Sequence, residues 1–533
     1  MLGTKGPLLA ESARRAGSLR SRPLLIAACK LSLVAAASLA HSTRADDVAP
    51  ADSCPTTRLS ASAIPVSTTP SRDAITYYVR TDGGDARQCT GRADAAYPGT
   101  GSARACAWKS PNVALPASGT PRMSGGDILL IAAGTYPIGD YGEMQPVPSG
   151  RSPDRPTRIL GKPGRMPRLQ GVAGIRSVLS LDGSSNVEIG NLEITDNSDC
   201  VYKHSEPRAA CNSAMQWARV GLYARASSNV WLHDLNIHGL AARGINAGDL
   251  RDWTVERTKL NRNGRAGWDG NIGAHGSNSG RMTFRGIEVA WNGCGERVAT
   301  GEPWACWAQA SGGYGDGFGT TETGGRWVIE DGYFHHNTSD GLDLRYMDGA
   351  DATNVTLRRI RAVANAGNQV KVKGNSLTED SVLVGHCSYF RNRFFMLDKD
   401  LCRADGSTLQ LVMTGNDTAI VRRNTIAGEG AAQIGHSEGD ESDRIVMQDN
   451  LVVGFPYFRS TKSLSRFNAG KSTASKRFEG NIAWNVRECP SSSSCTSRPK
   501  LRNMSLAAFD ARPLPGNAPP KAGALPCRPR TPE

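Results

Sequence analysis

The feature of this sequence that most limits its possible folds is an asparagine that recurs after short strands of alternating polarity. It stands at Asn263, Asn292, Asn337, Asn365 and Asn392. The steps between these positions are 29, 45, 28 and 27 residues, and the long step contains Cys294 and Cys306. A period in the twenties combined with period-two strands is typical of a parallel β-solenoid. Each coil of that fold buries half of its strand residues, and coils stacked about 4.8 Å apart form one continuous core.

The recurrent asparagines have a structural interpretation. Stacked at a bend, their amides would satisfy backbone groups that otherwise lack a partner. A globular α/β chain is the alternative, but no ten-residue window between the strands has convincing helical periodicity. Glycine is abundant, at 59 residues, and aromatic residues make up only 6% of the chain. This composition suits many turns around a narrow aliphatic core, so the sequence predicts an all-β solenoid.

Residues 1–45 have the pattern of an export signal. A basic segment contains Arg14, Arg15, Arg20 and Arg22. An apolar run over residues 23–40 follows it, and Lys30 is the only charged residue in that run. Small residues provide possible signal-peptidase cleavage sites after Ala40 or Ala45. A membrane anchor is the alternative, but the run is short and carries a lysine. The apolar stretch continues past Cys29, which argues against a lipoprotein box there, and no later stretch is long enough to span a membrane.

The cysteines predict disulfide-stapled loops. Without Cys29, twelve cysteines remain, and ten of them form close couples. The couples are Cys89/Cys106, Cys200/Cys211, Cys294/Cys306, Cys387/Cys402 and Cys489/Cys495, which leaves Cys54 and Cys527. An even number in an exported chain favours disulfides in an oxidising compartment, although sequence does not fix their connectivity. No couple has the spacing of a zinc site.

Composition divides the rest of the chain. Residues 46–72 are predicted to be a flexible linker, residues 73–496 the β-helix, and residues 497–533 a Pro-rich C-terminal segment.

The formal net charge is +13, and about +7 without residues 1–45. This excess favours a polyanionic partner, with a mixed solvated surface as the alternative. Because no basic run is interleaved with aromatics, nucleic acid is not expected. A secreted monomer is expected.

The order of three early segments resembles the opening of secreted right-handed parallel β-helix proteins. A Tyr77-Tyr78-Val79 strand is followed by Ala107-Trp108-Lys109-Ser110, and then by a Gly-Asp strand over residues 126–136 that ends in Ala-Gly-Thr-Tyr. Residues 509–519 resemble the segment that follows the last coil in such proteins. The resemblance implies a right-handed parallel β-helix, and it says little about the reaction.

The central stretch, residues 314–375, concentrates charged residues in short apolar strands. In Leu342-Asp343-Leu344 and Val370-Lys371-Val372-Lys373, the aliphatic residues are expected to face inward and the charged residues outward. Asp343 and Lys371 are 28 residues apart, and Asp316 and Asp340 are 24 apart, each close to one coil. The spacing therefore predicts Asp316, Asp343 and Lys371 on three neighbouring coils of one sheet.

Three motifs of this stretch together resemble the active-site region of polysaccharide lyase family 9, the calcium-dependent pectate lyase type. They are Asp-Gly-Phe, Asn-x-x-Asp-Gly-x-Asp-Leu and Gly-Asn-x-x-Lys. The resemblance implies that Asp316, Asp340 and Asp343 hold calcium and that Lys371 is the base. Ser339 stands where the family has a further aspartate, and a hydroxyl can coordinate calcium without adding charge.

These residue types suit β-elimination on an acidic sugar. Calcium would neutralise the uronate carboxylate, and a neutral lysine would remove the C5 proton. Arg345 and Lys373 are candidates for binding the carboxylates of the acidic polysaccharide. The sequence thus predicts a secreted calcium-dependent lyase of a uronate polysaccharide such as pectate. The alternatives are a non-catalytic glycan-binding β-helix, a glycoside hydrolase on the same fold, and, for each residue singly, an ordinary turn or a solvated face.

Overall fold

The computed structural model describes residues 74–140, 142–198, 217–272, 278–296, 306–308, 315–320, 323–347, 354–390, 396–397, 406–495, 498–515 and 523. The chain divides into two units, Met1–Asp52 and Ser53–Glu533, and all described residues belong to the second. The predicted export signal at 1–45 and linker at 46–72 lie outside the described residues. Within the described part, no helix has the length and apolarity needed to cross a bilayer.

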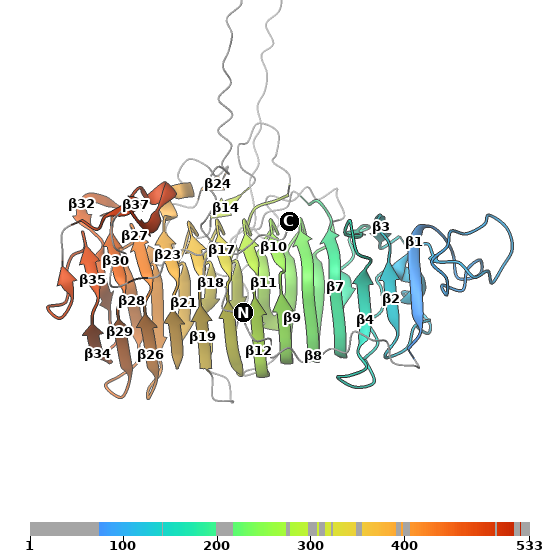
Figure 1. The fold of residues 1–533 in the computed structure, drawn as a ribbon, viewed down its shortest axis with the longest axis horizontal. Coiled ribbons are helices and arrows are strands. Elements are labelled where there is room, and N and C mark those ends of the chain that lie inside the picture. Colours follow the sequence, from blue (N-terminus) through green and yellow to red (C-terminus); the bar gives the residue numbers. More distant parts are fainter. Residues whose placement is uncertain are drawn as a thin grey trace, which may run out of the picture. The chain divides into compact units, whose positions relative to one another are not determined.

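The second unit is a parallel β-helix. A sheet of 32 strands runs through it, and its strands pair in parallel with the strands one coil before and one coil after (Figure 1). These pairings follow three columns, which we call faces one, two and three. The predicted all-β, right-handed parallel β-helix with disulfide-stapled loops is confirmed.

Long strands bend from one face to the next, so some strands contribute to several columns. Face one contains β6 (Ser177–Ser180), β8 (Val220–His238), β9 (Arg243–Glu256), β11 (Ala266–Ile272), β15 (Phe318–Thr320), β18 (Leu342–Leu344), β21 (Val370–Lys373), β25 (Leu409–Met413), β28 (Ala432–Glu438) and β33 (Arg466–Gly470). Face two contains β1 (Thr76–Gly84), β2 (Ile128–Ile131), β4 (Thr157–Gly161), β7 (Ser185–Thr195), β8, β9, β12 (Ser279–Arg285), β16 (Arg326–Glu330), β19 (Asn354–Arg358), β22 (Ser376–Glu379), β26 (Thr418–Arg422), β29 (Arg444–Gln448) and β34 (Ser475–Glu479). Face three contains β3 (Thr135–Ile138), β5 (Arg168–Gly171), β7, β8, β10 (Lys259–Asn261), β13 (Glu288–Ala290), β17 (Tyr333–His335), β20 (Arg361–Val363), β23 (Val382–Gly385), β27 (Thr425–Gly428), β30 (Leu451–Gly454), β35 (Ile482–Trp484) and β36 (Ser494–Cys495).

The remaining elements are short. Three two-stranded pairs lie outside the columns: β14 (Trp307–Ala308) with β24 (Met396–Leu397), β31 (Pro456–Tyr457) with β32 (Ser460–Leu464), and β37 (Leu501–Asn503) with β38 (Asp510–Pro513). Among the described residues, the helices are α1 (Pro111–Ala114), η1 (Cys387–Phe390) and η3 (Leu506–Ala508). This near absence of helix among the described residues agrees with the missing helical periodicity of the sequence.

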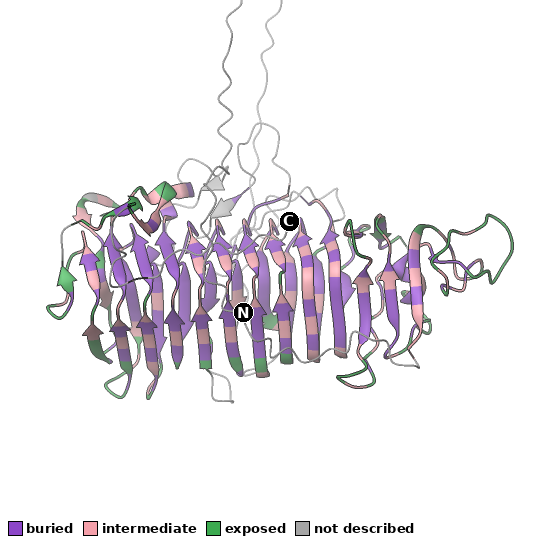
Figure 2. Ribbon diagram, viewed as in Figure 1, coloured by how far each residue is buried: buried purple, intermediate pink, exposed green. Residues whose placement is uncertain are grey.

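The core fills the inside of the coils and is aromatic in its middle section. Most residues of the strands are buried (Figure 2), and the apolar residues of the alternating pattern form the core, as the sequence predicts. Between β9 and β16 the core holds Trp253, Trp268, Phe284, Phe318 and Trp327, all at most 1% exposed. Their rings stack or meet edge to face at centroid distances of 5.1 to 6.2 Å. The expectation of a narrow aliphatic core was therefore incomplete, because the few aromatic residues are gathered here.

The predicted asparagine stack is present. Asn292 donates to Asn337 at 2.9 Å, Asn337 donates to Asn365 at 2.8 Å, and Asn263 donates to Asn292 at 3.0 Å. Their amides also reach backbone carbonyls one coil away, as from Asn337 to Val289 at 3.0 Å. Beyond Asn365 the next acceptor is Gln369, four residues along the chain, and Asn392 lies outside the described residues. The stack closes the bend between faces three and one.

A second asparagine stack, which sequence reasoning missed, closes the bend between faces two and three. Asn424 donates to Asn450 at 3.1 Å, and Asn450 donates to Asn481 at 2.9 Å. Ser381 extends this stack by donating its backbone N–H to Asn424 at 3.0 Å. All of these residues are almost completely buried. Side-chain amides that bond from coil to coil therefore fix one bend in the earlier coils, from Asn263 to Asn365, and a different bend in the later coils, from Asn424 to Asn481.

Disulfides close loops of this fold. Cys89–Cys106, Cys294–Cys306 and Cys489–Cys495 are bonded, as predicted. Cys387 is also disulfide-bonded. The remaining cysteines of the predicted couples, Cys200, Cys211 and Cys402, lie outside the described residues, as do Cys54 and Cys527.

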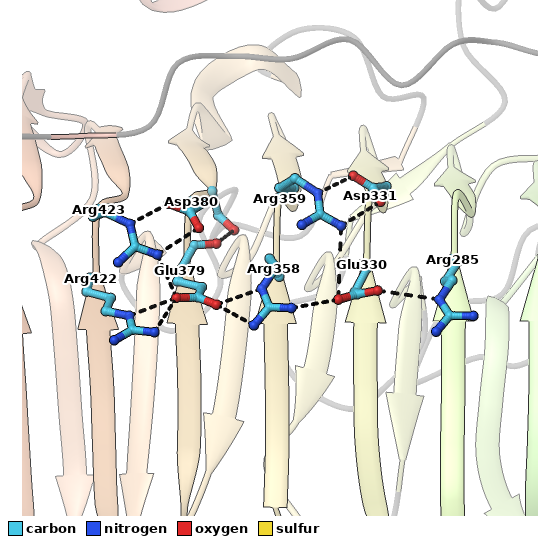
Figure 3. A network of polar contacts seen from close by, with 10 residues as sticks. Arg285, Glu330, Asp331, Arg358, Arg359, Glu379, Asp380, Arg422 and Arg423 are labelled. Atoms are coloured by element: carbon cyan, nitrogen blue, oxygen red, sulfur yellow. Dashed lines mark hydrogen bonds and ion pairs between the residues drawn. The ribbon is translucent and has the colours of Figure 1, made fainter. Parts of the chain in front are cut away.

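Charges of alternating sign follow one outward row of face two. In direct register stand Glu256, Arg285, Glu330, Arg358, Glu379 and Arg422. Figure 3 shows the row from Arg285 to Arg422. We call these residues the charge row. Arg358 bridges two coils, because it donates to Glu379 at 2.6 Å and to Glu330 at 3.0 Å. Glu379 is 2% exposed and also accepts from Arg422 at 2.7 Å and from Arg423 at 2.8 Å. The row therefore links neighbouring coils by charge-assisted hydrogen bonds.

Changing Glu379 to glutamine is expected to destabilise the protein by about 2 kcal/mol at neutral pH, because it removes the charge of a buried carboxylate that accepts hydrogen bonds from three partly exposed arginines. Burial opposes the charge of Glu379, but the hydrogen bonds from Arg358 and Arg422 outweigh burial and lower its pKa. A lowered pKa in the folded state means that this stabilisation is complete above the unfolded value, about 4.3, and is lost as pH falls through the folded value.

Urea unfolding of the wild type and of Glu379→Gln tests this expectation. The difference in unfolding free energy between the two proteins should be largest above about pH 5 and should shrink toward pH 3. The exposed Glu441→Gln is the matched control and should leave stability within about 0.5 kcal/mol of wild type. A difference for Glu379→Gln that does not change with pH would contradict a role for its charge.

Candidate active site

The central charged residues lie on adjacent coils of face one. β18 and β21 pair in parallel, and their register sets Asp343 directly beside Lys371. The same outward row continues to Gln410 on β25 and, in the other direction, through Gly319 on β15 to Asp269 on β11. The sequence prediction that one coil separates Asp343 from Lys371 is therefore correct.

Asp316 does not lie in the row predicted for it; it lies in a bend row together with Asp340. They stand in the bends before β15 and β18, where each is followed by a glycine and then by an inward-facing residue. Asp316 accepts the backbone N–H of Asp340 at 3.0 Å, and Asp340 accepts the backbone N–H of Asn368 at 2.7 Å. Asp316 is thus one coil before Asp340 and does not share the strand row of Asp343 and Lys371. One oxygen of each bend aspartate is used to hold the following coil.

Close packing requires glycine at the second position of the two Asp-Gly pairs, Gly317 and Gly341. A Cβ on Gly317 would lie 2.6 Å from the amide nitrogen of Asn337 and 2.6 Å from the carbonyl oxygen of Gly341. A Cβ on Gly341 would lie 2.5 Å from the amide nitrogen of Asn365. Any side chain here would collide with the asparagine stack. These glycines therefore belong to the architecture, whatever the chemistry of the aspartates beside them.

Lys371 is held by two carboxylates. Its Nζ donates to Asp340 Oδ2 at 2.5 Å and to Asp343 Oδ2 at 2.9 Å. Asp340 is completely buried, whereas Lys371 and Asp343 are each 7% exposed. The second oxygen of Asp343 accepts the backbone N–H of Arg345 at 3.0 Å. An ammonium and two carboxylates at these distances form a compact charged cluster on face one.

The other predicted site residues lie around this cluster. Ser339 is completely buried, and its backbone N–H donates to the carbonyl of Gly315 at 3.0 Å. Lys373 lies two residues beyond Lys371 on the same side of β21 and is 7% exposed. The side chain of Arg345 reaches out to Glu438 at 3.1 Å, and both side chains of that pair are more than two-fifths exposed.

As arranged, these residues do not fit a calcium ion. The ammonium of Lys371 is bonded to both Asp340 and Asp343, and the other oxygen of Asp340 is taken by Asn368. Calcium requires about six to eight oxygen ligands. Across the described ranges, no group of three or more His, Cys, Asp and Glu side chains is placed to hold a metal ion. The predicted ligand set of Asp316, Ser339, Asp340 and Asp343 stays a prediction, and no step below depends on the ion.

Sequence reasoning missed further polar residues of the same outward row. Asp269, 4% exposed, pairs with Arg243 and lies 3.7 Å from Arg265. Gln410, directly beside Lys371, donates to Ser437 at 3.2 Å. Asp269 stands in the alternating strand residues 266–272, so the outward row could have been extended to it. Arg265 precedes Asp269 by four residues on the same coil, whereas Arg243 comes from the preceding coil, in register with Ala266.

Comparison with known proteins gives similarity to solved structures only; no family model and no curated protein matches this chain. The A-module of mannuronan C-5 epimerase AlgE4 from Azotobacter vinelandii has a TM-score of 0.38 at 10% identity, over 69% of this chain and 91% of the epimerase module. Pectate lyase Pel9A has a TM-score of 0.36 at 11% identity, over 84% of this chain and 89% of the lyase. A rhamnogalacturonan lyase has a TM-score of 0.36 at 13% identity, over 81% of this chain and 91% of that protein.

Proposed function

We propose that this chain is an exported lyase that cleaves an acidic, uronate-containing polysaccharide by β-elimination, with Lys371 as the base. The observation that carries the proposal is the buried contact of one lysine with Asp340 and Asp343 on adjacent coils of face one. The motifs around these residues, and the even set of cysteines with its disulfides, support an exported enzyme of this type.

In the proposed reaction Lys371, as a neutral amine, takes the C5 proton of a uronate. The electrons of the C5–H bond form the C4–C5 double bond, the C4–O4 bond breaks, and the departing O4 gains a proton from solvent. Asp340 and Asp343 then stabilise the ammonium that Lys371 has become, much as a carboxylate stabilises the charged form of a catalytic histidine. The contacts at 2.5 and 2.9 Å correspond to this proton-loaded state.

The substrate carboxylate requires a cationic partner, because an unneutralised uronate resists loss of the neighbouring proton. Arg345 and Lys373 are the proposed partners, since both follow the Asp343 and Lys371 strand positions on face one. Arg345 is the more accessible of the two, and its contact with Glu438 is on the surface, where such a pair is weak and can be exchanged for a substrate carboxylate.

Incubation with polygalacturonate, alginate and chondroitin, with and without EDTA, tests the proposal. Lyase action creates an unsaturated product whose ultraviolet absorbance rises with time, and this signal should be absent from heat-inactivated protein. A signal that EDTA abolishes and added calcium restores would support the predicted metal dependence. No unsaturated product from any of the three polysaccharides would overturn the lyase proposal, and new reducing ends without absorbance would indicate a hydrolase instead.

A non-catalytic glycan-binding role is the second candidate, and one observation favours it. Both carboxylates beside Lys371 are already bonded to its ammonium, an arrangement that also serves simply to neutralise buried charge. In that case oligouronates would bind without any formation of unsaturated product. The polysaccharide incubation combined with a binding measurement separates the two roles.

A further inference from the structure

A pocket on face two lies apart from the Lys371 cluster and is not used by the proposed reaction. It has a volume of about 480 Å³, and residues of β7, β8, β9 and β12 line it. These four strands are consecutive neighbours on face two (Figure 1). Trp231, Asp252, Glu256, Arg281 and Arg285 contribute to its lining. Pockets of a few hundred Å³ commonly hold small ligands or single sugar units. Lys371, in contrast, stands on face one, on a strand well beyond these coils.

Trp231 gives this pocket an aromatic wall. It projects outward from β8, in register between Glu188 of the preceding coil and Thr254 of the following one. Its indole N–H donates to Glu256 at 3.3 Å, and the ring leans against His233 at 4.1 Å between centroids. The ring is therefore held on one side by His233 and is fixed in orientation. A tryptophan ring positioned in this way on an otherwise polar sheet offers an apolar face for a flat ligand.

Polar groups that suit a sugar surround the ring. Thr254 lies directly beside Trp231 in the same outward row, Thr283 lies one coil further along it, and both line the pocket. Asp252 accepts the backbone N–H of Arg281 at 2.8 Å, while Arg281 itself is exposed. Within the described part of the chain, the guanidinium of Arg281 has no hydrogen bond or ion pair. By comparison, Arg285 in the same pocket is paired with Glu256 and Glu330.

We propose that this pocket is a second carbohydrate-binding site, in which a sugar ring lies on Trp231, threonine and carboxylate groups take its hydroxyls, and Arg281 pairs with a sugar carboxylate. Hydroxyl groups need both donors and acceptors, which the lining supplies, and the unpaired cation distinguishes an acidic from a neutral sugar. The choice of a uronate chain rests on the proposed function. The site would hold the polysaccharide to face two while another segment of it, or another chain, reaches face one.

Calorimetric titration of a Lys371→Arg protein, which is expected to bind without cleaving, tests the site. The ligands are a galacturonate oligomer and, as the neutral comparison, a xylose oligomer of equal length. Trp231→Ala should weaken binding of both about tenfold, the loss expected for one aromatic contact. Trp484→Ala, which removes another half-buried tryptophan on face three, is the control and should leave binding unchanged. Arg281→Ala should weaken binding of the galacturonate oligomer and leave that of the xylose oligomer unchanged.

The outcomes separate this site from the proposed reaction. Loss of binding in Trp231→Ala would support the pocket even if the wild type forms no unsaturated product. Equal binding by Lys371→Arg alone and by its combinations with Trp231→Ala and Arg281→Ala would overturn the pocket, even if the wild type is an active lyase. Arg281 is exposed, so its variant keeps the test valid should Trp231→Ala fold poorly.

Discussion

Lys371→Arg is expected to lower the rate of unsaturated product formation by about 10²- to 10⁴-fold while the protein stays folded. A general base contributes rate enhancement of about that size, and arginine cannot lose its proton in a protein. Arginine can still donate to Asp340 and Asp343, which the lysine contacts at 2.5 and 2.9 Å, so the buried carboxylates keep a cation. The change therefore separates the chemistry of Lys371 from its structural role. Initial rates on polygalacturonate, followed by absorbance, give the measurement.

Two further variants complete this experiment. Lys371→Ala removes the cation as well and should destabilise the fold by about 3 kcal/mol, because it leaves the completely buried Asp340 without its partner. Lys471→Arg, at an exposed lysine, is the matched control and should keep full activity. If Lys371→Arg formed product at the wild-type rate, the assignment of Lys371 as base would be wrong, whatever the fate of the alanine variant.

Asn337→Ala is expected to be the most destabilising single change in the asparagine stack, by about 4 kcal/mol. The side chain of Asn337 accepts from Asn292 and donates to Asn365 and to the carbonyl of Val289, and it is completely buried. Alanine leaves these groups without partners in a place that water does not reach, and each unsatisfied group costs about 1 to 3 kcal/mol. Chemical denaturation at neutral pH measures the loss.

The exposed Asn271→Ala makes the same chemical change on β11 and should shift stability by less than about 0.5 kcal/mol. Equal stability of Asn337→Ala and wild type would mean that the coils do not depend on the stack. A lower denaturation midpoint with an unchanged denaturant slope is the expected pattern, because the change weakens the native state without altering how much surface unfolding exposes.

Sequence was sufficient for the fold because the solenoid repeats its local pattern. Alternating strands fix which residues face inward, and Asn263, Asn292, Asn337 and Asn365 mark one bend in four coils. The second stack, Asn424 to Asn481, was missed because it closes a different bend and begins only in later coils. The charge row was missed because its partners are 21 to 45 residues apart, as loops of varying length separate them.

The candidate site was predictable where no long loop intervenes. Asp343 and Lys371 are 28 residues apart, the length of one coil, and their register follows from strand alternation alone. The direction of the Asp340 side chain was not predictable, because Asp-Gly before a strand is compatible with a metal ligand and with a bend that holds the next coil. The structure shows Asp340 making the bend contact to Asn368 and also reaching Lys371.

The charge row has a consequence for how the length of this protein can change. Its signs alternate from Glu256 to Arg422, so every coil in this region differs in charge from both of its neighbours. Removing a single coil, such as the one that carries Arg358, would set Glu330 directly against Glu379. Removing two adjacent coils would restore opposite charges at the junction. Gain or loss of coils along this stretch is therefore expected to obey a parity rule, with an even number tolerated and an odd number opposed.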